Sequence, residues 1–192
     1  IAAAPPNMPA LVGATTVTNL TLETGTITDI AGQTLTITGT VSGTGTIKGS
    51  ATSNIIISGS GGSVGTLNFN QTTDGTTNVL NNLTMARTTS GAATLGNKTV
   101  VLGTVTLSDG TLTTGGNLHL RSTATTDARV AEITGTGAIT GNTTIERYIP
   151  ASGNRAWRLL AAPVDAASAP TINAAWQEGG AAGSARGDAV RA

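Results

Sequence analysis

The sequence predicts an all-β fold, a β-solenoid (parallel β-helix) of about six or seven irregular coils. Three observations predict it. A short apolar–polar–apolar motif recurs along the chain, turn-forming residues fill almost every gap, and aromatic residues make up only 2% of the 192 residues. Because the aromatic side chains that usually dominate a wide core are scarce, the interior has to be built from thin layers of Val, Ile and Leu.

The recurring motif alternates apolar and polar residues with period two, as in a strand with one buried and one exposed side. It occurs at seven places: NLTL (19–22), TLTI (34–37), NIII (54–57), NLTM (82–85), TVTL (104–107), NLHL (117–120) and NTTI (142–145). These starts lie 13 to 28 residues apart, a length that suits one coil of two or three strands. At about 4.8 Å per coil, such a stack would be about 30 Å long.

Further short strands are expected between the motifs, and Gly, Asn, Asp and Ser separate them. The expected strands lie in TGTITDI (24–30), GTIKG (45–49), GTLNFN (65–70), KTVVLG (98–103), ARVAEITG (128–135) and GAIT (137–140). Pro is absent between Ala10 and Ile149, so no strand there loses a donor of the hydrogen-bond ladder. Thr, which makes up about a fifth of the chain, suits outward strand positions.

Composition divides the chain into three regions. Residues 1–14 form an extended leader rich in Ala and Pro, and residues 15–149 form the β-solenoid domain. Residues 150–192 change to Ala, Arg, Pro and Trp with almost no Thr. We expect this last region to hold a cap and the start of a second, incomplete β module with a flexible tail.

Charge and cysteine content exclude several classes of function. Charged residues make up 10% of the chain and the formal net charge is zero, whereas a nucleic-acid binder needs a basic face. There is no Cys, so neither disulfides nor thiolate metal sites are expected. No stretch approaches the roughly 20 apolar residues of a membrane span. The chain starts without Met or a signal peptide, and we expect a mature form or a fragment.

The residues give little support to catalysis. His119 is the only His, and its alternation with Leu118 and Leu120 predicts that it faces outward. The acidic residues are scattered, and Asp74 and Asp109 precede Gly as turn residues do. We therefore expect no enzyme activity, no catalytic residues, no cofactor and no metal site. A polysaccharide-binding or polysaccharide-degrading β-helix stays as an alternative, since two carboxylates from adjacent coils could meet.

Three sets of residues are candidates for other roles. Asn residues that precede strands could stack as a ladder at one corner of the coils; these are Asn19, Asn54, Asn82, Asn117 and Asn142. A cluster of Arg and aromatic residues could cap the open last coil or contact carbohydrate; these are Arg147, Tyr148, Arg155, Trp157 and Arg158. Thr-x-Thr pairs such as Thr34/Thr36 and Thr104/Thr106 could align into a flat array, which makes an ice-binding solenoid an alternative function.

The sequence also resembles a known family. The run GNTTIERYIPA (141–151), followed by NRAWRLLAAPV (154–164) and INAAWQEG (172–179), resembles large secreted surface proteins of the Bacteroidetes. In these, Thr/Gly-rich β-helix repeats precede a different β-rich module. The segments at 67–88 and 106–122 show the same pattern, and the resemblance covers about residues 15–180. It implies a right-handed β-helix and an extracellular location reached by type IX secretion. The C-terminal sorting domain of such proteins is not in this sequence, which favours a fragment.

Taken together, these observations predict a non-enzymatic, extracellular structural or adhesive segment of a larger surface or filament-forming protein. Its expected partners are other copies of itself, neighbouring domains of the same protein, or a surface polysaccharide. Stacked repeats bury each coil against the next, so stability should grow with the number of coils.

Overall fold

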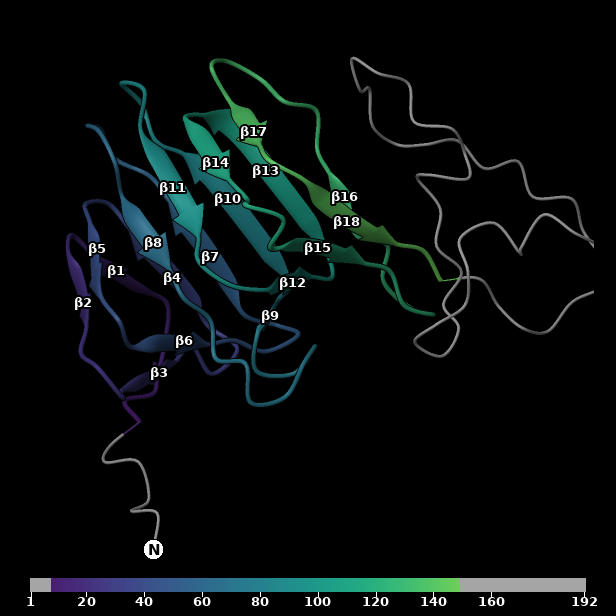
Figure 1. The fold of residues 1–192 in the computed structure, drawn as a ribbon, viewed down its shortest axis with the longest axis horizontal. Coiled ribbons are helices and arrows are strands. Elements are labelled where there is room, and N and C mark those ends of the chain that lie inside the picture. The colour runs from purple at the N-terminus through teal and green to yellow at the C-terminus, as the bar shows by residue number, and fades with distance from the viewer. Residues whose placement is uncertain (1–7, 149–192) are drawn as a thin grey trace, which may run out of the picture. The chain divides into compact units, whose positions relative to one another are not determined.

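The computed structural model describes residues 8–148, and these form a parallel β-solenoid without a helix (Figure 1). The predicted fold class is thereby confirmed. All of the described residues belong to the first of the chain's two units, Ile1–Pro150. The predicted cap and second module at 150–192 lie outside the described residues.

Each of six coils contributes three short strands. The first three coils consist of β1 (Thr15–Val17), β2 (Leu20–Leu22) and β3 (Ile27–Asp29); β4 (Thr34–Ile37), β5 (Val41–Gly43) and β6 (Thr46–Lys48); and β7 (Asn54–Ile57), β8 (Gly65–Leu67) and β9 (Val79–Leu80). The last three consist of β10 (Asn82–Ala86), β11 (Ala92–Leu95) and β12 (Thr99–Val101); β13 (Thr104–Asp109), β14 (Thr111–Thr113) and β15 (Leu118–Arg121); and β16 (Arg129–Val130), β17 (Ala138–Thr140) and β18 (Thr143–Glu146).

Strands stack into three faces, and all of their pairings are parallel. Face 1 is the six-stranded sheet β1-β4-β7-β10-β13-β16. Face 2 consists of the pair β2-β5 followed by β8-β11-β14-β17. Face 3 consists of the pair β3-β6 followed by β9-β12-β15-β18. Figure 1 shows β8, β11, β14 and β17 side by side on face 2.

The coils differ in length, although the strands on face 1 stay in register. Successive register partners in its first inward row are 20, 20, 28, 22 and 25 residues apart; they are Thr15, Leu35, Ile55, Leu83, Val105 and Val130. The seven sequence motifs do not all occupy this face. Those at 34, 54, 82 and 104 begin strands of face 1, that at 19 lies on face 2, and those at 117 and 142 lie on face 3. The 13-residue interval, between the motifs at 104 and 117, therefore separates two strands of the same coil.

The core is a set of aliphatic columns that run along the stack. One column on face 1 holds Ile37, Ile57, Met85 and Leu107, all fully buried and in register. Face 2 adds Leu67 and Leu95, and face 3 adds Leu80, Val101 and Leu120. Full burial of one such side chain stabilises the fold by about 1.5–3 kcal/mol, so the columns are the main source of stability.

Two local features set the ends and corners of the coils. The end of the leader joins the stack, because Leu11 N donates to Asp29 O and Asp29 N donates to Pro9 O, each at 2.9 Å. At the start of β8, Gly65 has φ +108° and a Cβ there would lie 2.2 Å from Val41 O. Only Gly satisfies both conditions, so neighbouring coils can approach closely at this corner.

Candidate functional site

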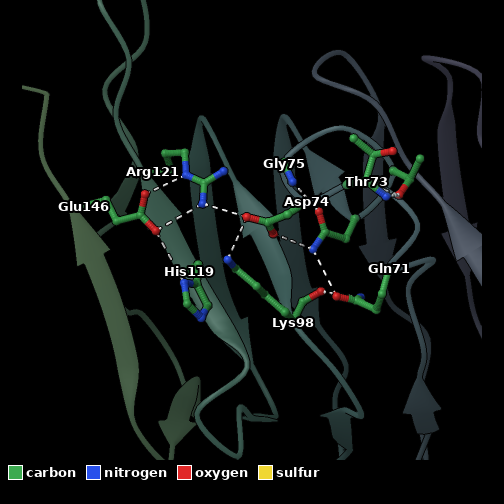
Figure 2. A network of polar contacts seen from close by, with 10 residues as sticks. Gln71, Thr73, Asp74, Gly75, Lys98, His119, Arg121 and Glu146 are labelled. Carbon is green, nitrogen blue, oxygen red and sulfur yellow. Dashed lines mark hydrogen bonds and ion pairs between the residues drawn. The ribbon is translucent and has the colours of Figure 1, made fainter. Parts of the chain in front are cut away.

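Charged side chains gather on the outer side of face 3, where they come from four successive coils (Figure 2). The charge network, as we name it, consists of Asp74, Lys98, His119, Arg121 and Glu146. This arrangement could not be predicted from the sequence, because the five residues are scattered over 73 positions, from Asp74 to Glu146. The stacking of coils of unequal length brings them together.

Asp74 is carried by a loop, residues 70–78, that makes the third coil the longest. The loop is shaped by its own polar groups: Thr77 Oγ1 donates to Asn70 O at 2.9 Å, and Gly75 N donates to Asn78 Oδ1 at 2.7 Å. Gln71 Nε2 ties it to the fourth coil by donating to Lys98 O at 2.8 Å. These bonds fasten the loop internally and to the fourth coil.

Asp74 contacts two cations from different coils. Lys98 Nζ lies 2.9 Å from Asp74 Oδ2, and Arg121 Nη2 lies 3.3 Å from the same oxygen. The hydrogen bond from Lys98 holds the pKa of Asp74 well below its ordinary value, with help from Asn78 and Arg121 and against the effect of burial. Asp74 is thus an anion that links the third, fourth and fifth coils at any physiological pH.

Arg121 binds Glu146 through two parallel hydrogen bonds. Its Nε donates to Glu146 Oε2 at 2.6 Å and its Nη2 to Oε1 at 3.2 Å, the bidentate geometry that a planar guanidinium favours. The bond from Arg121 lowers the pKa of Glu146, and the bond to Glu146 raises the pKa of Arg121. The pair joins the fifth coil to the sixth.

His119 faces outward, as the alternation predicted, but its side chain is only 20% exposed. Nδ1 is buried without a hydrogen-bond partner among the described residues and lies 3.5 Å from Glu146 Oε1. Burial lowers the pKa of His119, and the nearby charge of Lys98 lowers it further, although Glu146 opposes both. The imidazole is therefore neutral at pH 7.

Two valines on the outer side of face 3 are buried. Val79 and Val100 are register partners of each other, and Val100 is also the partner of His119, so all three point outward from face 3. Yet the two valines are 1% and 0% exposed and stand apart from the interior core. We attribute their burial to loop 70–78, which reaches Lys98 and Arg121 on either side of them.

The carboxylates of the charge network are already paired with its cations, which limits the chemistry that they can perform. Asp74 and Glu146 both accept hydrogen bonds from Arg121. Within residues 8–148, no group of three or more His, Cys, Asp or Glu side chains could hold a metal ion. The arrangement is suited to fastening four coils together and to keeping loop 70–78 in place.

Thr hydroxyls form rows on the two other faces. On face 2 the outward position of every coil carries a hydroxyl; the row consists of Thr21, Ser42, Thr66, Thr94, Thr113 and Thr140. On face 1 an outward row reads Thr16, Thr36, Ile56, Thr84 and Thr106, beside a second row of Thr34, Asn54, Asn82 and Thr104. The register of the strands decides which side chains line up in a row, and the sequence alone did not determine that register.

The five candidate Asn residues are divided among three corners, one before each face, and do not stack in one column. Asn54 and Asn82 are register partners, and Asn82 Nδ2 donates to Asn54 Oδ1 at 2.9 Å. Asn19 precedes β2 and accepts from Thr40 N at 3.0 Å. Asn117 and Asn142 precede β15 and β18, where Asn117 Nδ2 donates to Leu95 O at 2.9 Å.

Two of the five candidate cap residues lie within the described part of the chain. Arg147 pairs with Asp127, and its Nη1 also donates to Ala128 O at 3.0 Å. Tyr148 is 50% exposed. Arg155, Trp157 and Arg158 lie outside the described residues, so the predicted cap stays a prediction.

Arg87, a residue that the sequence did not single out, is buried and only 4% exposed. Its Nε donates to Gly61 O and Gly62 O at 3.2 and 3.1 Å, and its Nη1 donates to Thr38 O and Ser58 O at 2.8 and 3.0 Å. A single Arg after a strand gives no sequence signal of this kind. The guanidinium joins the second, third and fourth coils where face 1 turns into face 2.

No family model matches the chain, and comparison with curated proteins and with solved structures gives no match either. Among residues 8–148, no helix is long and apolar enough to cross a membrane.

Proposed function

We propose that this chain is a non-enzymatic structural segment of a larger extracellular protein, a stiff and neutral spacer that also serves in adhesion or in filaments. The observation that carries the proposal is the set of polar links that join different coils over a continuous aliphatic interior. The resemblance to secreted Bacteroidetes proteins adds the expected route, type IX secretion.

The links between coils span most of the stack. Lys48 pairs with Asp29 at 2.7 Å between the first and second coils, and the charge network joins the third to the sixth (Figure 2). Partly exposed ion pairs contribute only about 0–1 kcal/mol each to stability. Their role in a spacer is to keep neighbouring coils aligned, while the buried columns supply the free energy of folding.

The location is tested on the native protein with antibodies raised against the full chain. We expect intact cells to be labelled, and brief protease treatment of intact cells to remove the label. Labelling only after lysis would contradict an extracellular role. The mechanical role is tested by pulling single molecules of the full chain, where we expect unfolding in steps of about one coil length each.

Face 1 favours ice binding as a second candidate function, because two outward rows with several Thr residues run side by side there. The Thr34/Thr36 pair and the Thr104/Thr106 pair lie in the same two rows. Thermal hysteresis of the purified chain is the test. Hysteresis that disappears in Thr84→Lys but persists in Thr94→Lys, on face 2, would establish it, and no hysteresis in the wild type would remove it.

Polysaccharide cleavage gains no support from face 3. The carboxylates of Asp74 and Glu146 come closest to the pair that such a reaction uses, and Arg121 is hydrogen-bonded to both. A neutral polysaccharide as an adhesion partner is compatible with the hydroxyl rows and belongs to the spacer and adhesion proposal.

A further inference from the structure

We propose that face 2 is the surface by which two copies of this chain associate side by side. The inference rests on the proposed structural role and deepens it, because it names the contact face and the partner. Three features of the solenoid support it: the hydroxyl row on face 2, the distribution of charge over the three faces, and the equal spacing of the coils.

The hydroxyl row runs through all six coils. Neighbouring hydroxyls at its two ends bond to each other, Thr21 with Ser42 at 3.3 Å and Thr140 to Thr113 at 3.2 Å. In the middle of the row, the side chains of Thr66 and Thr94 form no hydrogen bond with any other described residue. These central hydroxyls can donate to, and accept from, a partner.

Charge separates face 2 from the other faces. None of its strands, β2, β5, β8, β11, β14 and β17, contains a charged residue. Face 3 carries the charge network and the Asp29–Lys48 pair, and face 1 ends in Arg129. A second copy carries the same charged groups on the same faces. Two copies that meet through a charged face therefore place like charges opposite each other in many alignments, whereas two copies that meet through the neutral face 2 do not.

The row is also complementary to itself. A hydroxyl is both a donor and an acceptor, so identical rows can bond in either direction along the stack. Two copies have the same spacing between coils, about 4.8 Å, and their hydroxyls stay matched over the whole length. A two-fold arrangement, in which the same patch serves both copies, is the commonest symmetry of homodimers.

The size of the face sets the strength of the association. Six strands at about 4.8 Å and three residues per strand cover roughly 300 Å² on each copy. A stable complex buries about 800 Å² per partner. The pairing of two such chains is therefore weak, and it gains strength where a longer protein repeats the same face, because each further contact forms within an existing complex.

Cysteine cross-linking tests the face, since the chain contains no Cys of its own. Thr94→Cys places one thiol at the centre of face 2. Thr84→Cys is the matched control, because Thr84 lies in the same coil, faces outward from face 1 and is half-buried like Thr94. The full chain at high concentration is treated with a short bismaleimide and analysed by denaturing electrophoresis.

We expect Thr94→Cys to give a cross-linked dimer in about tenfold greater yield than Thr84→Cys, and an added Thr113→Lys to reduce that yield about tenfold through like-charge repulsion. Equal yields from the two variants, or no dimer from either, would overturn the proposal. Circular dichroism of each variant establishes that it is folded. The spacer role does not depend on the result, because antibody labelling of intact cells tests it separately.

Discussion

Arg87 shows how a single buried side chain can join three coils without an acidic partner. A guanidinium removed from water is costly unless its N–H groups are hydrogen-bonded. Here carbonyl oxygens of Thr38, Ser58, Gly61 and Gly62 accept those bonds. The planar group with its fixed fork of donors is suited to several acceptors at once, and Lys is not.

Replacing Arg87 by Lys should therefore destabilise the protein by about 2–4 kcal/mol, because an ammonium cannot reach all four carbonyls and some stay buried without a donor. Chemical denaturation measures the change. Arg129→Lys is the control, since Arg129 is exposed, and it should alter stability by less than about 0.5 kcal/mol. A similar small loss of stability in both variants would show that other donors satisfy the four carbonyl oxygens when Arg87 is replaced.

His119 should make stability depend on pH in a narrow range. Burial lowers its pKa in the folded state below the ordinary value of 6.5, so the unfolded chain takes up a proton at a higher pH than the folded chain does. Stability is then complete above about pH 6.5 and falls as the pH drops through 6.5 toward the lowered pKa. As the only His, His119 is the main side chain expected to titrate here.

Denaturation curves at pH 7.5 and pH 5.5 measure this dependence. The wild type should be less stable at the lower pH, and His119→Gln should lose most of that difference. An equal loss in the variant would assign the effect to other groups. Sequence alternation predicted the outward direction of His119, but its burial depends on neighbours that only the register reveals.

At the scale of elements, loop 70–78 is the clearest departure from a regular coil. Asp74 was predicted as a turn residue, and it does lie in a turn. Its additional contacts with Lys98 and Arg121 could not be predicted, since they join residues 24 and 47 positions apart. Most strands were predicted within a residue or two, whereas β1, β5, β9, β11 and β14 were missed; four of these five have only two or three residues.

Asp74→Asn should loosen the loop without unfolding the stack. The Asn side chain keeps a hydrogen-bond acceptor but loses the charge that attracts both cations. We expect amide hydrogen exchange of Gly75 and Thr77 to become about tenfold faster, and the global stability to fall by no more than about 1 kcal/mol, since Asp74 is half-exposed. Unchanged exchange would show that Gln71 and Asn78 suffice to hold the loop.

Gly65→Ala should destabilise the fold far more than the addition of one methyl group suggests. The new Cβ would lie 2.2 Å from Val41 O, and the backbone has φ +108°, so β8 would have to move away from β5. We expect a loss of about 2–4 kcal/mol in denaturation experiments. Gly62→Ala is the control, because nothing lies within 4 Å of its added Cβ, and a comparable loss there would contradict this explanation.

At the scale of the whole molecule, stability should vary along the stack. Ile57 is completely buried between its register neighbours Ile37 and Met85, whereas Ile145 in the sixth coil is only partly buried. Ile57→Ala should therefore cost about 2–5 kcal/mol and Ile145→Ala about 1 kcal/mol. Thermal unfolding of both variants measures the difference, and equal effects would mean that the sixth coil is packed as well as the third.

The sequence predicted the architecture because period-two alternation, scarce aromatics and frequent turn residues all point to thin stacked coils. It could not assign motifs to faces, because the same pattern suits all three. The five Asn residues show this limit: they share a local pattern but are divided among three corners, and only Asn54 and Asn82 bond to each other through their side chains.

The unequal coil lengths have a practical consequence for engineering. The third coil accommodates the whole of loop 70–78 between Phe69 and Val79, while its strands on face 1 keep the register of their neighbours. Foreign peptides inserted into this loop, with Asp74 and its contacts to Lys98 and Arg121 kept, would project from the third coil at a fixed position along the stack. The scaffold is thus suited to displaying epitopes or enzymes at chosen intervals.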